Sequence, residues 1–185
     1  LAPHVPMPNE LIGEEWEFIL IEDDDVINAF ALPSAKVGVY TGLFKIVKSD
    51  TDLAVVIGHE MGHVVAKHGE ERMSQQMVAL GGSILLSQAT KGDTREDRER
   101  LSRIYGLGST IGVLLPYSRL HENEADRLGL IYMAKAGYNP RVAISFWERM
   151  ENEKLFQIPE LISTHPSSKS RIMELNSLME EAMLY

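Results

Sequence analysis

Two histidines and a glutamate in the first half of the chain have the types and spacing of a metal-assisted catalytic centre. The segment from His59 to His63 reads His-Glu-Met-Gly-His and follows an apolar run over residues 53–58. On an α-helix, residues four apart lie about 40° apart and one turn above each other, so both imidazoles can reach one ion. Glu60 can then lie beside the ion and take a proton from an activated water. The alternative is an exposed helix end with two surface histidines, but the small and apolar neighbours argue against it.

A catalytic zinc site has three protein ligands and one open position, so a third ligand has to come from another segment. Glu122 and Asp126 are four residues apart and share one face of a helix. Glu122 can bind the metal, while Asp126 can accept the N–H of a ligating histidine and fix its tautomer. Alone, these carboxylates would indicate a solvated helix face. Together with His59 and His63, they predict a metal site.

His68 is the other histidine close to this motif. It follows His63 by five residues, about 140° around a helix, and so cannot face the same ion. We interpret His68 as a structural or surface residue. The metzincin class of zinc peptidases would need a histidine at position 69, where this chain has Gly69, so that class is excluded.

Composition narrows the class of protein. The chain has 185 residues, which fits a single catalytic domain over 1–185. The net charge of -9, without a basic cluster, argues against nucleic acid as a partner. No cysteine is present, which excludes disulfides and thiolate zinc sites. The sequence contains no run of about 18 apolar residues, so no segment is predicted to span a membrane.

The elements that must position these residues follow an α+β order, with strands first and helices afterwards. An irregular, proline-rich arm is expected over 1–15. Patterns of large and β-branched residues predict three strands, at Trp16–Ile21, Val26–Leu32 and Lys36–Tyr40. A short helix over 42–47 is expected to follow them.

The helix that carries the two histidines is expected to begin at a cap, Ser49 or Asp50, and to end at Gly69. Pro116 is expected to break the helical pattern, and the later helices are predicted at about 70–90, 95–113, 120–135, 140–154 and 166–184. Two apolar segments, 77–89 and 104–115, are expected to pack as core. The alternatives for them are a lid over the site or a docking surface for a membrane partner.

The amino-acid sequence of these motifs resembles that of peptidase family M48, a family of gluzincin metallopeptidases. The resemblance rests on 59–68 and 122–127 and extends to 28–31, 40–43, and 164–166 with Arg171. It therefore covers about 28–171. Without membrane spans, the chain is most similar to the soluble BepA-like periplasmic group, although the tetratricopeptide repeats of that group are absent. The resemblance implies a mainly helical, minigluzincin-type catalytic domain with a small N-terminal sheet beside the active-site helix.

The resemblance also implies roles for individual residues. His59, His63 and Glu122 would hold one Zn²⁺, and Glu60 would be the general base. His165 and Arg171 are candidate donors to the oxyanion of the tetrahedral intermediate. His165 has two further interpretations, as a fourth ligand that closes the site or as a helix cap. The alternative for Arg171 is to pair with Asp126 or Glu122 from behind.

Substrate is expected to bind as an extended strand beside the active-site helix. The resemblance indicates Asn28, Ala29 and Phe30 as that sheet edge, and an ordinary core strand is the alternative. The expected function is zinc-dependent endopeptidase activity on polypeptides in bacterial envelope protein quality control. The expected location is the periplasm or envelope, with peripheral contact to the membrane or outer-membrane proteins. The second hypothesis is an autoinhibited, chaperone-like metal-binding module with little proteolysis.

Overall fold

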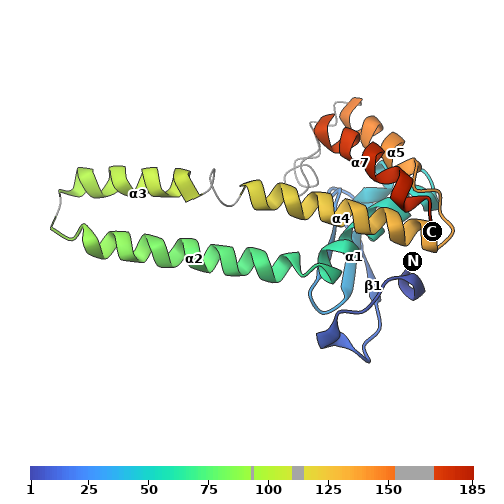
Figure 1. The fold of residues 1–185 in the computed structure, drawn as a ribbon, viewed down its shortest axis with the longest axis horizontal. Helices are drawn as coiled ribbons and strands as arrows, with labels where there is room; N and C mark the ends of the chain where they lie inside the picture. Colours follow the sequence, from blue (N-terminus) through green and yellow to red (C-terminus); the bar gives the residue numbers. More distant parts are fainter. Residues whose placement is uncertain (93, 110–114, 153–168) are drawn as a thin grey trace. The chain divides into compact units, whose positions relative to one another are not determined.

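A computed structural model describes the backbone over residues 1–92, 94–109, 115–152 and 169–185 (Figure 1). The chain divides into two compact units. The first unit combines Leu1–Lys67 with Glu122–Tyr185, and the second consists of His68–His121. The expected α+β fold class is confirmed, because helices make up most of the described chain and the sheet has three strands.

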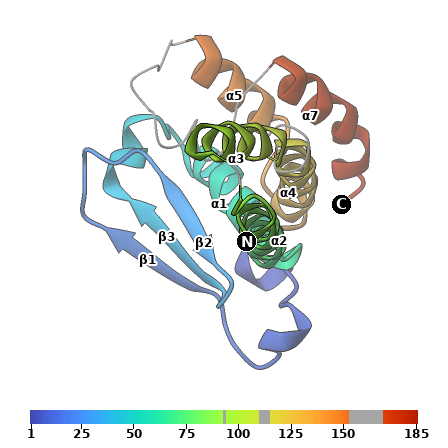
Figure 2. The same ribbon diagram turned by 90° about the vertical axis from the view of Figure 1, so that its left-hand side faces the viewer.

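A three-stranded sheet follows the N-terminal arm, in which two short 3-10 turns, η1 and η2, form at Ala2–His4 and Asn9–Leu11. The strands are β1 (Glu17–Ile21), β2 (Ala29–Leu32) and β3 (Lys36–Tyr40). Their order is β1-β3-β2, with β1 parallel and β2 antiparallel to β3 (Figure 2). A 3-10 turn, η3 (Thr41–Lys45), then leads toward the first long helix.

The two faces of the sheet differ in their surroundings. Ala29, Val37 and Val39 share one face and are buried in the hydrophobic core. On the other face, the ring of Phe30 covers Gly38, where an added Cβ would lie 2.4 Å from a ring carbon. Burial of the first face fixes the register, since a slip by one residue would turn these side chains outward.

Helix α1 (Asp50–Val65) begins as its sequence predicts. The side chain of Ser49 accepts a hydrogen bond from the Asp52 backbone N–H, which satisfies a free donor of the first turn. Asp52 is buried and forms an ion pair of 2.7 Å with Arg149. This pair ties the start of α1 to α5 (Val142–Asn152).

The predicted end of this helix at Gly69 was wrong. Helix α1 ends at Val65, and the left-handed residue that turns the chain is Lys67, with φ of 59°. Left-handed backbone is uncommon for a residue other than glycine. The Lys67 ammonium also forms a solvent-exposed ion pair with Glu10 in the arm. Gly69 lies instead in the first turn of α2 (His68–Ala89).

The first unit is completed by part of α4 (Leu115–Lys135), by α5, and by α7 (Lys169–Ala182). Helix α4 begins five residues earlier than expected, and Pro116 does not break it. Pro116 is the second residue of the helix, where the backbone N–H of any residue would lack a partner within the helix. Proline at this position therefore costs little stability. Side chains from α1, α4, α5 and α7 form one core, which includes Met61, Leu130, Phe146 and Leu175.

The second unit contains α2 and α3 (Arg95–Ser109), which lie side by side. The Tyr105 hydroxyl donates to the Ala79 carbonyl across this pair. The expectation that residues 77–89 pack as core was wrong, because most of their large apolar side chains are exposed: Met77, Val78, Leu80, Ile84 and Leu85. Within the described part of the chain, no helix has both the length and the apolar character needed to cross a bilayer.

Candidate metal centre

The centre forms where α1 and the second half of α4 approach each other closely. A Cβ added to Gly62 would lie 2.8 Å from the Ala125 carbonyl oxygen, and one added to Gly129 would lie 2.9 Å from the His59 backbone nitrogen. Both contacts are with backbone atoms, which cannot move aside cheaply. The absence of side chains at Gly62 and Gly129 therefore sets the helix separation and brings Glu122 level with His59.

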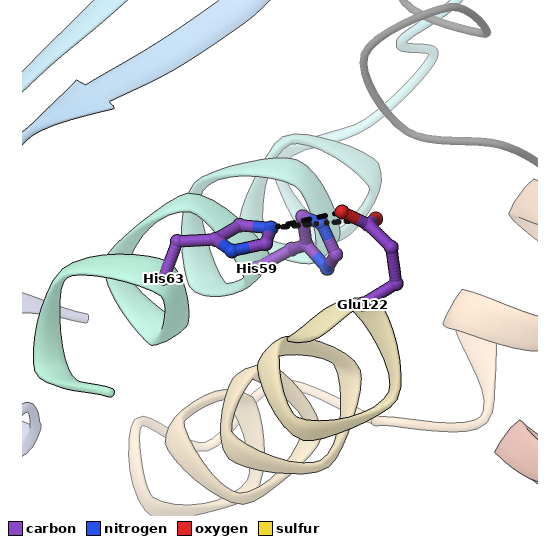
Figure 3. Close-up of side chains that lie close together, drawn as sticks. All are labelled: His59, His63 and Glu122. Carbon is purple, nitrogen blue, oxygen red and sulfur yellow. Dashed lines mark hydrogen bonds and ion pairs between the residues drawn. The ribbon is translucent and has the colours of Figure 1, made fainter. Parts of the chain in front are cut away.

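Three potential ligands converge at this crossing. His59 and His63 extend from α1, and Glu122 extends toward them from α4 (Figure 3). The two Nε2 atoms are 3.0 Å apart, and the carboxylate oxygens of Glu122 lie 3.2 Å from His59 Nε2 and 3.4 Å from His63 Nε2. His59 and Glu122 are buried and His63 is half-buried, which leaves access from the His63 side.

The donor set fits a tetrahedral metal. Zinc–ligand bonds of about 2.0–2.1 Å at tetrahedral angles place the donor atoms roughly 3.3 Å apart. The two Nε2 atoms are 3.0 Å apart, and each lies close to that value from one Glu122 oxygen, 3.2 Å from Oε2 for His59 and 3.4 Å from Oε1 for His63. Two imidazole nitrogens and a carboxylate are a donor set that zinc accepts, and three ligands leave a fourth position for water or substrate. Among the described residues, this is the cluster with metal-site geometry.

Asp126 fixes the orientation of His59. The His59 Nδ1–H donates to Asp126 Oδ1 over 2.8 Å, which leaves Nε2 directed at the centre. Arg171 donates two hydrogen bonds of 2.7 Å to the same carboxylate, from Nε and from Nη2. All three side chains are buried, so the aspartate links a candidate ligand histidine to a buried guanidinium.

Trp147 on α5 completes this arrangement. The Arg171 guanidinium carbon lies 3.7 Å from the centre of its ring, which is a cation–π contact. Arg171 Nη1 also lies 3.5 Å from Glu122 Oε2. The positive charge of Arg171 is therefore shared between Asp126 and a ligand of the centre, while the indole covers its other side.

The pKa shifts of the centre follow from burial and neighbouring charge. Burial by itself would lower the pKa of His59, but the hydrogen bond and charge of Asp126, with the hydrogen bond to Glu122, raise this pKa overall. For His63, burial and the nearby His59 lower the pKa to about 4, so this imidazole is neutral at physiological pH. Burial opposes ionisation of Asp126, but Arg171 and His59 lower its pKa and keep it a carboxylate.

Glu60 lies in the same buried region. It follows His59 on α1, is buried, and acts on the pKa of His63 through its charge. Burial of a carboxylate so close to a cluster of metal-ligand type is the setting that a general base requires.

The other predicted site residues have different positions. Asn28 precedes β2 and is half-buried, and Ala29 and Phe30 lie in β2, at an outer edge of the sheet. Helix α1 packs against this strand. Arg171 lies beside Asp126, to which it donates two hydrogen bonds, and beside Glu122. His165 lies outside the described residues.

His68, interpreted as structural or surface, is buried in the second unit. Its ring stacks on that of His121 with centroids 4.2 Å apart, and His121 Nε2 lies 2.7 Å from Glu71 Oε2. His68 is not part of the ligand cluster. This stack joins the residue that starts α2 to the residue that precedes Glu122.

Sequence reasoning missed Trp147 and the glycines at the helix crossing. Gly58 and Gly62 are four residues apart on the ligand helix, and Gly129 is four residues after Ala125. Such spacing of small residues indicates close helix packing and was the available signal. For Trp147, no local pattern connects it to Arg171, which is 24 positions away in the chain.

Comparison with known proteins agrees with this geometry. Residues 2–179 match the model of peptidase family M48. The chain is 36% identical over 178 residues to the mitochondrial metalloendopeptidase OMA1 of Arabidopsis thaliana, which covers 95% of this chain and 34% of that protein. It is 34% identical over 172 residues to the OMA1 protein of Schizosaccharomyces pombe. That alignment covers 92% of this chain and 48% of that protein.

A bacterial relative is also similar. The beta-barrel assembly-enhancing protease of Escherichia coli is 29% identical over 169 residues, covering 86% of this chain and 33% of that protein. The chain thus spans about a third to a half of the length of these relatives. The family match covers nearly the whole chain and includes both helices that carry the ligand cluster, so the chain belongs to peptidase family M48.

Proposed function

We propose that this chain is a zinc-dependent endopeptidase domain. The observation that carries the proposal is the His59, His63 and Glu122 cluster with a buried Glu60 beside it. Membership of a peptidase family supports it. When bound, zinc lowers the pKa of a coordinated water to about 7 and polarises the scissile carbonyl.

Glu60 performs the proton transfers in this proposal. It accepts the proton of the attacking water and delivers a proton to the leaving amine. Its place in the rigid middle of α1, next to His59, holds it at a fixed height relative to the ligands. Burial keeps competing bulk water from its carboxylate.

Asp126 and Arg171 support the ligands. Asp126 holds the His59 tautomer through its hydrogen bond of 2.8 Å. Arg171 is paired with Asp126 through two hydrogen bonds, which engage its Nε and Nη2 with that carboxylate. We assign Arg171 as a positioning residue rather than an oxyanion donor.

Strand β2 is the proposed substrate-binding edge. Tyr40 donates its N–H to the Asn28 carbonyl, and the antiparallel register then pairs Phe30 with Gly38. Because alternate residues bond across an antiparallel pair, the backbone N–H and C=O groups of Ala29 and Ala31 point to the free edge. An extended peptide can bond to these groups and lie alongside α1.

Zinc content and casein hydrolysis test this function. Wild type should bind about one zinc per chain and cleave casein, because the three ligands are preformed. Glu60→Gln should keep the zinc and lose at least about 10²-fold in rate, since the base is removed but the ligands remain. Glu180→Gln, the same change at an exposed carboxylate of α7, is the matched control and should retain full activity. A folded protein without bound zinc, or an active Glu60→Gln variant, would contradict the proposal.

His165 decides between this function and the chaperone-like alternative. If His165 closes the site as a fourth ligand, His165→Ala should raise the rate of casein cleavage. If it donates to the oxyanion, the same variant should lose rate while zinc content stays at one per chain. If the Glu60→Gln variant keeps the cellular role of the wild type, the hypothesis of an autoinhibited, chaperone-like module is favoured.

For the cellular setting, we propose protein quality control in the bacterial envelope. The name of the Escherichia coli relative, a beta-barrel assembly-enhancing protease, supports this setting, while other relatives carry mitochondrial names. Fractionation of the source cells is the test, and an exclusively cytosolic protein would contradict it.

A further inference from the structure

Strand β1 is an outer strand of the sheet, on the edge opposite β2. It pairs with β3, and among the described residues no strand pairs with its other side. Figure 2 shows β1 at the margin of the sheet away from β2. A sheet edge of this kind offers a row of backbone donors and acceptors to another chain.

The direction of those donors follows from the ladder. Glu17 donates its backbone N–H to the Ala35 carbonyl over 3.0 Å, so the N–H of Glu17 faces β3. Since residues of a strand alternate in direction, Ile19 and Ile21 also bond toward β3. The backbone N–H and C=O groups of Phe18 and Leu20 therefore point to the open edge.

The three central side chains of β1 are apolar and exposed, and they lie on both faces of the strand. Phe18 is 47% exposed, Ile19 49% and Leu20 63%. Exposed apolar side chains on a free edge strand are a feature that proteins without a strand partner usually avoid. Their presence points to a surface that is covered by a partner.

A hollow lies beside this strand. It has a volume of about 370 Å³ and is lined by Phe18, by the first residues of the arm, and by Leu53, Ile57 and Tyr138. An added strand presents alternate side chains to one face, so an apolar side chain of that strand can enter this hollow. Backbone bonds at the edge and a side-chain hollow are the two parts of strand-addition recognition.

Both ends of β1 are flanked by acidic residues. Glu14, Glu15 and Glu17 lie at its start, and the run 22–25 reads Glu-Asp-Asp-Asp at its end. All are exposed, and within the described part of the chain only Glu17 has an ion pair, with Lys36. The edge therefore carries negative charge at both ends of an apolar centre.

This charge pattern selects the occupant. We propose that β1 binds an extended segment of another polypeptide with an apolar, β-prone centre and Lys or Arg residues at both ends. A second copy of this chain does not fit, because either parallel or antiparallel pairing of two β1 strands brings acidic ends together. This surface, defined by Phe18, Ile19, Leu20 and the acidic ends, is separate from the substrate edge β2 and does not depend on proteolysis.

Two labelled peptides test the proposal on the full chain carrying Glu60→Gln, which prevents cleavage from confusing the result. The cationic probe is Lys-Lys-Val-Thr-Val-Thr-Val-Lys-Lys, and the anionic probe replaces each Lys with Glu. Fluorescence anisotropy should show the cationic probe binding at least about tenfold more tightly than the anionic one, and losing affinity as salt rises. Equal binding of the two probes, or no binding of the cationic probe, would overturn the proposal.

Two variants and two controls locate the binding edge. Leu20→Pro removes an outward N–H without breaking the β3 ladder and should weaken the cationic probe about tenfold. Leu20→Lys repels the same probe and should weaken it similarly, which covers failure of the proline variant to fold. Leu184→Lys, at a more exposed leucine near the C-terminus, should leave binding unchanged. Ala31→Pro, on the substrate edge β2, measures any probe bound there and should weaken the cationic probe less than Leu20→Pro does.

The controls also separate the competing occupants. If Ala31→Pro abolishes binding while Leu20→Pro does not, the peptide binds β2 and the proposal is wrong. If sedimentation shows a dimer that Leu20→Pro dissociates, β1 pairs with a second copy and the proposal is wrong. Neither result would bear on zinc content or casein cleavage, so the proposed function stands or falls separately.

Discussion

At the scale of single residues, the centre depends on side chains that act through their neighbours. His59 is directed by Asp126, and Asp126 is held by Arg171, which rests on Trp147. These contacts are buried, where a hydrogen bond to a charged group is worth more than in water. Removing one member should therefore change the affinity of the ligands for metal as well as the stability of the fold.

Asp126→Asn tests this chain of contacts. The amide keeps the shape but loses the charge that orients His59 and pairs with Arg171, so metal affinity should fall about 10–100-fold. Competition with a chromophoric zinc chelator measures it. Asp52→Asn is the matched control, a buried carboxylate that pairs with Arg149 away from the centre. It should reduce stability yet leave zinc affinity unchanged, and an equal loss of affinity in both variants would refute the role of Asp126.

Tyr132 gives a prediction for alkaline pH. Burial raises the pKa of its hydroxyl to about 12, from 10.0 when unfolded. Because the folded pKa is the higher one, the contribution to stability is complete below pH 10 and is lost between pH 10 and about 12. In that window Tyr132→Phe should lose less stability than wild type, by up to about 1.4 kcal/mol per pH unit. Urea unfolding at several pH values measures the difference, and Tyr185→Phe, at an exposed position, should behave as wild type.

At the scale of elements, two helices and their separation create the centre. Helix α1 presents its histidines one turn apart, and the middle of α4 presents Glu122 and Asp126 one turn apart. Their close approach rests on backbone contacts at Gly62 and Gly129. Glycine is unfavourable inside a helix, so these two glycines contribute to the centre by allowing α1 and α4 to approach closely.

Gly62→Ala should open this crossing. The new methyl group would lie 2.8 Å from the Ala125 carbonyl oxygen, so the helices must separate, at a cost of about 1–3 kcal/mol. Zinc affinity should fall in parallel, since Glu122 moves with α4. Urea unfolding and chelator competition measure the two effects. Gly81→Ala in α2 is the control, where nothing lies within 4 Å, and it should stabilise by up to about 1 kcal/mol. Unchanged zinc affinity in Gly62→Ala would contradict this account.

At the scale of the whole molecule, the ligand-bearing unit is assembled from two stretches of chain that the second unit separates. A bound metal would join these stretches, because two candidate ligands lie before residues 68–121 and one lies after them. A ligand that binds only the folded state raises its stability by mass action. The metal should therefore contribute to folding as well as to chemistry.

Metal removal tests this coupling. At free zinc about 100-fold above the dissociation constant, binding contributes about 2.7 kcal/mol, so EDTA should lower Tm by roughly 5–10 °C. Restored zinc should return the original Tm in a thermal melt. In His63→Ala, where a ligand is missing, EDTA should have little effect. A wild-type Tm that does not respond to EDTA would show that the cluster does not bind metal in solution.

Sequence by itself determined what depends on local geometry. The four-residue spacing of His59 and His63 fixes their common face on any α-helix, and the same spacing relates Glu122 to Asp126. The three strands, the Ser49 cap and the α+β order also follow from local patterns, with limits that differ by a few residues. The predicted turn at Gly69 failed because Lys67, a residue type without a local turn signal, takes the left-handed conformation instead.

Only the tertiary structure decided which of these local features meet. The approach of Gly62 to Ala125 brings Glu122 to the histidines, and the fold of α7 brings Arg171 to Asp126 rather than to solvent. It also left most of the large apolar side chains of residues 77–89 in α2 exposed, where their composition alone suggested core. The hydrophobic effect favours burial but has no direction. The sequence pattern therefore identifies the apolar residues that can be buried, and only tertiary packing determines which of them are buried.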